Sequence, residues 1–211
     1  MESKSSPTPS ACPNNPQPRS APAGRLYVVA TPIGNLDDIT LRAIRTLGSV
    51  ALVAAEDTRH TARLLSHHRI QARLISYHEH NEPERAAQLL ERLLAGDAVA
   101  LVSDAGTPGV SDPGYRLVQA AAAQGIPVHP VPGPSAPIAA LSAAGLPSDS
   151  FVFLGFAPRR QGRRARLLEE LAAERRTLIW YESPRRVQDF LGELLAAWGD
   201  RPAVLAREMT K

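Results

Sequence analysis

The sequence has little of several residue types that define particular classes of protein. It contains a single cysteine, Cys12, so no disulfide can form within one chain and no cysteine-based metal site is available. Aromatic residues make up only 5% of the chain, and no apolar run approaches the roughly 20 residues that a membrane-spanning helix needs. The chain also starts with polar residues rather than with an apolar export signal. We therefore expect a soluble protein of the reducing cytoplasm.

Two widespread nucleotide-binding motifs are missing as well. A dinucleotide-binding fold would show G-x-G-x-x-G in its first strand–helix turn, where this chain has TPIGNL over residues 31–36. The phosphate-binding pattern G-x-x-x-x-G-K-[ST] does not occur either. These absences exclude both kinds of nucleotide site.

The chain has enough apolar residues to build a sizeable core. Hydrophobic residues make up 44% of its 211 residues, which suffices for one large or two small domains. The formal net charge of +3 permits an anionic partner but does not require one. The placement of the arginines is therefore more informative than the total charge.

The pattern along the chain predicts a proline-rich tail followed by two α/β domains. Residues 1–24 combine six prolines with polar residues and lack apolar periodicity, so we exclude this disordered tail from the fold. From Leu26 onward, short β-branched runs alternate with helical stretches, which is typical of βα units around a largely parallel sheet. A boundary at 145–147 gives an N-terminal domain over 25–146 and a C-terminal domain over 147–211. The predicted strands are 26–30, 50–54, 73–76, 98–102, 128–131, 151–154, 177–181 and 203–206.

The C-terminal domain is predicted to be incomplete. It supplies only three of these strands, and the chain stops soon after the last of them, AVLA at 203–206. A sheet without its next strand has an edge of unpaired backbone groups. We therefore expect a truncated domain that is less stable than the N-terminal one.

Four loops rich in glycine and proline follow predicted strands. Ligands of parallel sheets bind at the carboxyl ends of the strands, where such loops meet, and glycine lets the backbone approach a ligand closely. Any one of these loops could be a plain strand–helix turn, but four at one edge favour a ligand site. The loops are 31–36, 56–59, 103–114 and 132–136.

Six segments of the chain resemble a known family. They are LYVVATPIGNLDDITLRAI, AEDTRHTARLL, LVSDAGTPGVSDPG, VPGPSA, YESPRR and AREMTK, and together they span residues 25–211. The chain is similar to the bacterial 16S rRNA (cytidine-2′-O)-methyltransferases, which belong to the tetrapyrrole (corrin/porphyrin) methylase class. This resemblance implies two α/β domains with S-adenosylmethionine bound between them, usually in a homodimer that acts on the small ribosomal subunit.

The resemblance also implies particular site residues. Tetrapyrrole methylases proper tend to carry G-x-G-x-G in the first loop and a compact G-D-P turn, whereas this chain has TPIG and the longer SDAGTPG. This departure favours the RNA-modifying branch. The implied cofactor-binding residues are Ile33, Gly34, Asp104, Gly106, Val110, Ser135, Ala136, Tyr181 and Ala206.

Charged residues near the predicted loops are candidates for substrate binding and proton transfer. Asp57 and Arg59 follow a buried strand, where they could hold a substrate or pair with each other. The spacing of His78 and His80 could suit a metal, but no further ligands accompany them, so a solvated loop is favoured and no metal is predicted. A ribose hydroxyl is a weak acid, so a carboxylate that takes its proton would assist methyl transfer. The candidates for that role are Asp57 and Glu182, and those for RNA binding are Arg59, His80, Asn81, Arg185 and Arg186.

An arginine-rich stretch, Arg159 to Arg176, has a local charge of 7 − 3 = +4. It is either a phosphate-binding surface or a solvated helix face. Three functions stay open at this point: an rRNA ribose methyltransferase, a small-molecule methyltransferase acting on a tetrapyrrole, and a non-catalytic RNA-binding factor.

Overall fold

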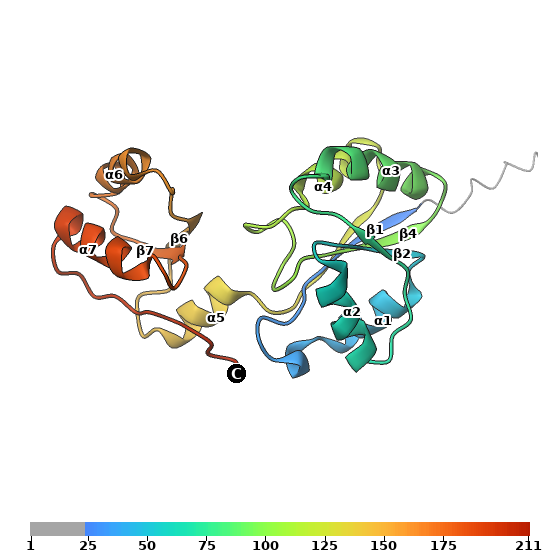
Figure 1. The fold of residues 1–211 in the computed structure, drawn as a ribbon, viewed down its shortest axis with the longest axis horizontal. Helices are drawn as coiled ribbons and strands as arrows, with labels where there is room; N and C mark the ends of the chain where they lie inside the picture. Colours follow the sequence, from blue (N-terminus) through green and yellow to red (C-terminus); the bar gives the residue numbers. More distant parts are fainter. Residues whose placement is uncertain (1–23) are drawn as a thin grey trace, which may run out of the picture.

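The computed structural model describes residues 24–211, which form two α/β units (Figure 1). Cys12 and the predicted tail up to residue 23 lie outside the described residues. Gly24, the last residue of that predicted tail, belongs to the folded part. It is buried, and a side chain there would lie 2.0 Å from the carbonyl oxygen of Leu93.

The N-terminal unit is built on a five-stranded sheet with the order β3-β2-β4-β1-β5. Every pair of neighbouring strands is parallel, as the alternating sequence pattern predicts. The central strands are apolar on both faces because helices cover both sides of the sheet. The strands are β1 (Arg25–Val29), β2 (Leu52–Ala55), β3 (Leu74–Ser76), β4 (Ala98–Val102) and β5 (Val128–Val131).

Two pairs of helices sandwich this sheet. Ala43 and Leu47 of α1 and Leu64 and Leu65 of α2 pack in one apolar core with β2 and β4. The second core, on the opposite face of the sheet, holds side chains of α3 and α4 (Figure 1). The helices are α1 (Leu41–Ser49), α2 (Thr58–His67), α3 (Glu82–Leu94) and α4 (Tyr115–Ala123), and a short 3-10 turn, η1 (Leu36–Asp38), precedes α1.

Both helices of the first pair begin at the carboxyl edge of the sheet. The Thr40 side chain accepts a hydrogen bond from the Ala43 N–H and caps α1. The Asp57 carboxylate accepts one from the Arg59 N–H and caps α2. The start of each helix is therefore fixed beside the loops that were predicted to bind a ligand.

The C-terminal unit is smaller and has a thinner core. Helix α5 (Ala136–Ala143) leads from the first sheet to β6 (Phe151–Phe156), which pairs in parallel with β7 (Thr177–Tyr181) (Figure 1). Helices α6 (Gln161–Glu170) and α7 (Val187–Trp198) complete the unit. Its fully buried residues are Ala157, Leu168 and Phe190, against which Trp180, Leu194 and Trp198 pack.

The predicted strand at 203–206 is wrong. These residues pair with no strand among the described residues, and Val204 and Leu205 are 53% and 66% exposed. A β-branched apolar run has only a preference for extended backbone, and it becomes a strand when another strand offers it an edge. Here β6 and β7 pair with each other and the segment continues past them.

Candidate functional site

The loops at the carboxyl edge of the first sheet hold one another by hydrogen bonds. Thr31 and Gly106 form an isolated antiparallel bridge, with N–H to carbonyl distances of 2.8 and 3.0 Å. The buried Thr31 hydroxyl donates to the Ser103 carbonyl at 3.1 Å. The Thr107 hydroxyl donates to the Pro134 carbonyl at 3.4 Å. The loops after β1, β4 and β5 therefore converge, as predicted.

A cavity of about 330 Å³ opens beside these loops. Such a volume is within the range of small-molecule sites. Two of the predicted cofactor residues, Ile33 and Ser135, line it. Gly106 lies next to Ile33: its φ is +81°, and a side chain there would lie 3.6 Å from Ile33 Cγ2. The remaining lining residues are Asp38, Thr40, Gly133, Pro134, Ala139 and Thr210.

Thr210 was not predicted as a site residue, although it belongs to the AREMTK motif. A side chain at Gly34 would lie 2.7 Å from the Thr210 hydroxyl, so the last residues pack against the first loop. A larger hollow of about 420 Å³ lies at the amino ends of β2 and β3, against α3. None of the converging loops reaches it, so it is not the site.

A cluster of carboxylates occupies the same edge of the sheet. Asp104 accepts a hydrogen bond from the Asp57 N–H at 3.0 Å, and its own N–H donates to Glu56 at 3.3 Å. Burial raises the pKa of Glu56, and the charges of Asp112 and Asp104 raise it further. Burial also raises the pKa of Asp112, which faces Asp104 as well. Glu56 and Asp112 are therefore the carboxyl groups of this edge that hold a proton more tightly than usual.

Glu82, which was not predicted as a site residue, binds the end of the long 103–114 loop. Its carboxylate accepts hydrogen bonds from the Tyr77 hydroxyl at 3.0 Å and from the Gly114 N–H at 3.1 Å. It also forms an ion pair with Arg116 at 3.4 Å. The one sequence signal was an acidic residue in the first turn of a helix, which alone indicates only a favourable dipole contact.

Asp57 and Arg59 pair with each other, which is one of the two alternatives left open by the sequence. Their side chains meet at 3.3 Å, and the Arg59 side chain is 88% exposed. This contact lowers the pKa of Asp57. The carboxylate thus serves as the cap of α2 and as the partner of Arg59.

The C-terminal unit brings a second group of predicted residues next to the long loop. A side chain at Gly155 of β6 would lie 3.0 Å from the Ser111 hydroxyl, so the two units touch there. Tyr181, at the end of β7, meets the Phe153 ring edge to face and the Phe156 ring at a tilted angle. Burial raises the pKa of Tyr181, and the negative charge of Asp112 raises it further. The charge of Asp112 therefore acts on Tyr181 across the boundary between the units.

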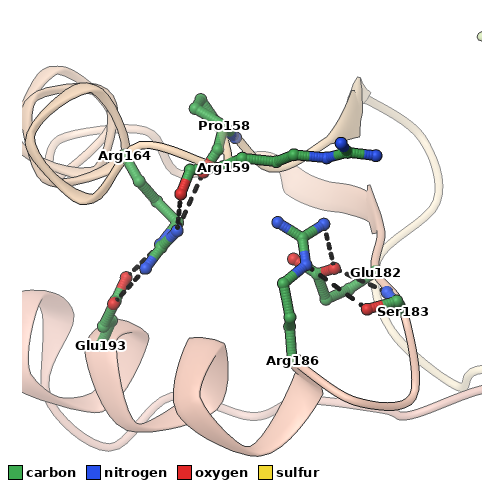
Figure 2. A network of polar contacts seen from close by, with 7 residues as sticks. All are labelled: Pro158, Arg159, Arg164, Glu182, Ser183, Arg186 and Glu193. Atoms are coloured by element: carbon green, nitrogen blue, oxygen red, sulfur yellow. Dashed lines mark hydrogen bonds and ion pairs between the residues drawn. The ribbon is translucent and has the colours of Figure 1, made fainter.

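Glu182 and Arg186 are joined to each other (Figure 2). Their side chains meet at 2.6 Å, and only 7% of the Glu182 side chain is exposed. Glu182 also accepts a hydrogen bond from the Ser183 N–H. Arg185 is exposed and has no ion pair among residues 24–211.

A further arginine holds the C-terminal unit together. Arg164 of α6 donates to both carboxylate oxygens of Glu193 on α7 and to the carbonyls of Pro158 and Arg159 (Figure 2). Within the arginine-rich stretch 159–176, Arg166 and Arg176 also pair with neighbouring glutamates. The stretch is therefore partly a structural network and partly an exposed cationic surface.

Comparison with known proteins identifies the family. The family described as Tetrapyrrole (Corrin/Porphyrin) Methylases matches residues 25–211. The chain belongs to this family. It is 56% identical over 190 residues to the Ribosomal RNA small subunit methyltransferase I of Pseudomonas aeruginosa, covering 90% of this chain and 67% of that protein. It is 52% identical over 188 residues to the protein of the same name from Halalkalibacterium halodurans, covering 89% of this chain and 65% of that protein. The chain thus spans about two thirds of the length of these relatives.

Solved structures agree with this assignment of the fold. The uroporphyrin-III-C-methyltransferase of Thermus thermophilus gives a TM-score of 0.59 at 25% identity, over 82% of this chain and 73% of that one. A structure of uroporphyrin-III C-methyl transferase from the same organism, complexed with S-adenyl homocysteine, gives 0.59 at 23% identity over 84% of this chain and 78% of that one.

The other predicted residues of this methylase lie apart from the cavity. Val110 is 40% exposed in the long loop, and Ala206 is exposed in the irregular segment that follows α7. His80 is exposed next to His78. Asn81 bonds within its own loop, where its side chain accepts from the His78 N–H at 2.8 Å and donates to Ser76.

Residues 24–211 contain no group of three or more histidine, cysteine or acidic side chains arranged to hold a metal ion. Within the same range, every helix is too short or too polar to cross a membrane.

Proposed function

We propose that this chain carries the S-adenosylmethionine-dependent methyltransferase unit that methylates the 2′-oxygen of a cytidine ribose in 16S rRNA. The observation that carries this proposal is identity of 52–56% to proteins named Ribosomal RNA small subunit methyltransferase I, over about nine tenths of this chain. The converging loops and the cavity beside them support it, because a methyl donor needs such a site.

The residues at the carboxyl edge fit this cofactor. The cavity has a suitable volume, Asp38 lines it, and further carboxylates lie at the same edge of the sheet, which suits a ligand that carries a sulfonium and an ammonium cation. Ile33, Gly34, Ser135 and Ala136 would hold it from the first and last loops. The other proposed contacts are Asp104, Gly106, Val110, Tyr181 and Ala206. When bound, S-adenosylmethionine supplies an activated methyl group.

The protein then has to align the ribose oxygen and keep water out. The raised pKa values of Glu56 and Asp112 make these carboxylates stronger bases than an ordinary acidic residue. We assign acceptance of the 2′-hydroxyl proton to Asp112, because it lies in the long loop where the adjacent Ser111 contacts Gly155 of the C-terminal unit. Asp57 and Glu182 stay proposals for this role, although each already has an arginine partner.

Exposed arginines at the boundary would bind the phosphates next to the target nucleotide. Arg59 and Arg185 are exposed and suit this role. Arg186 already pairs with Glu182, so its contribution would be smaller. His80 and Asn81 stay proposals as contacts farther along the RNA. We further propose that the chain acts in the cytoplasm as a homodimer, which sedimentation of the purified chain would test.

Transfer of a labelled methyl group tests the function. Purified chain and labelled S-adenosylmethionine are incubated with 30S particles, with naked 16S rRNA and with uroporphyrin III, the substrate named for the Thermus thermophilus structural relative. We expect label in the RNA, at a ribose 2′-oxygen. Label in the tetrapyrrole alone would indicate a small-molecule methyltransferase. Cofactor binding absent while RNA binding persists would indicate a non-catalytic RNA-binding factor.

A further inference from the structure

The face of the N-terminal unit formed by α1 and α2 is strongly basic. These two helices carry Arg42, Arg45, Arg59 and Arg63 and contain no acidic residue, so their combined charge is +4. The helices α3 and α4 on the opposite face carry three arginines and three glutamates, a combined charge of zero. Each pair of helices packs an apolar face against one side of the same sheet. The difference in charge is therefore unrelated to the fold.

The four arginines are exposed, and three of them have no counter-ion. Of these four arginines, only Arg59 forms an ion pair with another residue of 24–211, namely Asp57. The first acidic residue after Asp57 in the sequence is Glu79. On α2, Arg59, Arg63 and His67 are spaced four apart, so they share one face of the helix. Like charges at this spacing repel each other unless an anion lies against them.

This basic face starts at the candidate site. Thr40, which caps α1, lines the cavity, and the N–H of Asp57, which caps α2, donates to Asp104. From Arg59 to His67 the helix extends for about 12 Å, at a rise of about 1.5 Å per residue. A polyanion bound at the candidate site can therefore continue over α1 and α2.

The chemistry of the face fits RNA phosphates better than a lipid surface. Lysine occurs only at positions 4 and 211, so the cations of this face are all arginines, whose planar forks match phosphate groups. A helix that lies on a membrane exposes large apolar side chains beside its cations. Helix α2 exposes none, because Leu64 and Leu65 are buried, and α1 exposes a single one, Leu41, at its first residue. One apolar side chain does not make the apolar stripe of a membrane-bound helix.

We propose that the exposed face of α1 and α2, with Arg42, Arg45, Arg59 and Arg63, is a second RNA-binding surface that holds the phosphate backbone flanking the target nucleotide. The identification of RNA as the partner rests on the proposed function. The proposal implies that the substrate is a long or folded RNA, because a short oligonucleotide in the site would not reach this face.

The test compares salt dependence of RNA binding in matched variants. The triple variant Arg42→Ala/Arg45→Ala/Arg63→Ala removes the unpaired charges and leaves Arg59 in place. The matched control, Arg25→Ala/Arg73→Ala/Arg85→Ala, removes the same charge from the amino edge of the sheet and from α3, and none of these arginines forms an ion pair among residues 24–211. With a long 16S rRNA fragment, the slope of log affinity against log salt should become shallower by about 2 in the triple variant, at roughly 0.7 to 0.9 for each lost phosphate contact. The control and the charge-keeping variant Arg42→Lys/Arg45→Lys/Arg63→Lys should retain the slope.

The outcomes separate this proposal from the proposed function. Equal slopes in the wild type and the triple variant would overturn the RNA-binding face, even if methyl transfer to RNA proceeds. Equal losses in the triple variant and the matched control would also overturn it, because the effect would then be one of net charge. Loss of binding to anionic phospholipid vesicles with unchanged RNA binding would point to a membrane surface instead. A shallower slope in the triple variant alone would support the face, even if no RNA is methylated.

Discussion

Replacing Phe190 by leucine should destabilise the C-terminal unit and leave the five-stranded unit unchanged. Phe190 is only 4% exposed and is one of three fully buried residues in its core, whereas the two cores of the first sheet contain twelve and eleven. Its ring meets Trp180 edge to face, with centroids 5.3 Å apart. In so small a core, few neighbours can move to fill the space that the ring leaves.

The size of the effect follows from these contacts. Loss of the aromatic pair and incomplete refilling of the space should cost about 1 to 2 kcal/mol in the free energy of unfolding. A small unit has a urea dependence of about 1 kcal/mol per molar, so its unfolding midpoint should fall by about 1 to 2 M urea.

Tryptophan fluorescence measures this transition selectively. The chain has two tryptophans, Trp180 and Trp198, and both pack in the core of the C-terminal unit. Far-UV circular dichroism reports mainly on the larger N-terminal unit. The fluorescence midpoint should lie below the dichroism midpoint and should alone shift in Phe190→Leu. Limited proteolysis of the wild type should likewise give its first cuts between residues 148 and 211.

A matched variant in the other unit completes the test. Leu117 is fully buried in the first sheet's core, so Leu117→Ala should lower the free energy of unfolding of the N-terminal unit by about 3 kcal/mol. The dichroism midpoint of this variant should fall accordingly. Its fluorescence midpoint should stay unchanged. If the two probes give one coincident transition that moves in both variants, the units unfold together and the reasoning from separate cores is refuted.

Three further predictions concern the site. Asp104→Ala should weaken S-adenosylmethionine binding by about 10- to 100-fold, because an ionised acceptor at the converging loops is lost, and calorimetric titration with unchanged affinity would contradict this role. Arg185→Ala should make the slope of log RNA affinity against log salt shallower by about 0.7 to 0.9. Arg186→Ala should instead lower the free energy of unfolding of the C-terminal unit by about 2 kcal/mol, because Glu182 is left buried without its partner. Burial raises the pKa of Asp112 above 3.8, so the folded chain loses stability as the pH rises through that raised pKa. The variant Asp112→Asn should therefore be more stable at neutral pH, and its methyl-transfer rate should lack the acid limb. A variant with the wild-type pH profile would exclude Asp112 as the proton acceptor.

The sequence by itself determined most of the elements and the edge of the sheet at which the glycine- and proline-rich loops converge. The strands at 98–102, 128–131 and 177–181 were predicted with the bounds that the structure has, because each is an apolar run closed by polar, glycine or proline residues. The site edge followed from the same pattern, since all strands of a parallel sheet direct the loops that follow them to one side. Both inferences use only neighbouring residues and a general rule of sheet geometry.

Only the tertiary structure decided which side chains are free to act. Asp57 and Glu182 were equivalent to any other carboxylate after a strand, until packing gave each of them an arginine partner. No sequence pattern indicated a role for Glu56 or Asp112, because their raised pKa values depend on burial and on charges that other loops bring close. The segment 203–206 has the composition of a strand and found no edge to pair with. In each case the outcome depends on atoms that are distant in the chain, and a local pattern of residues does not specify them.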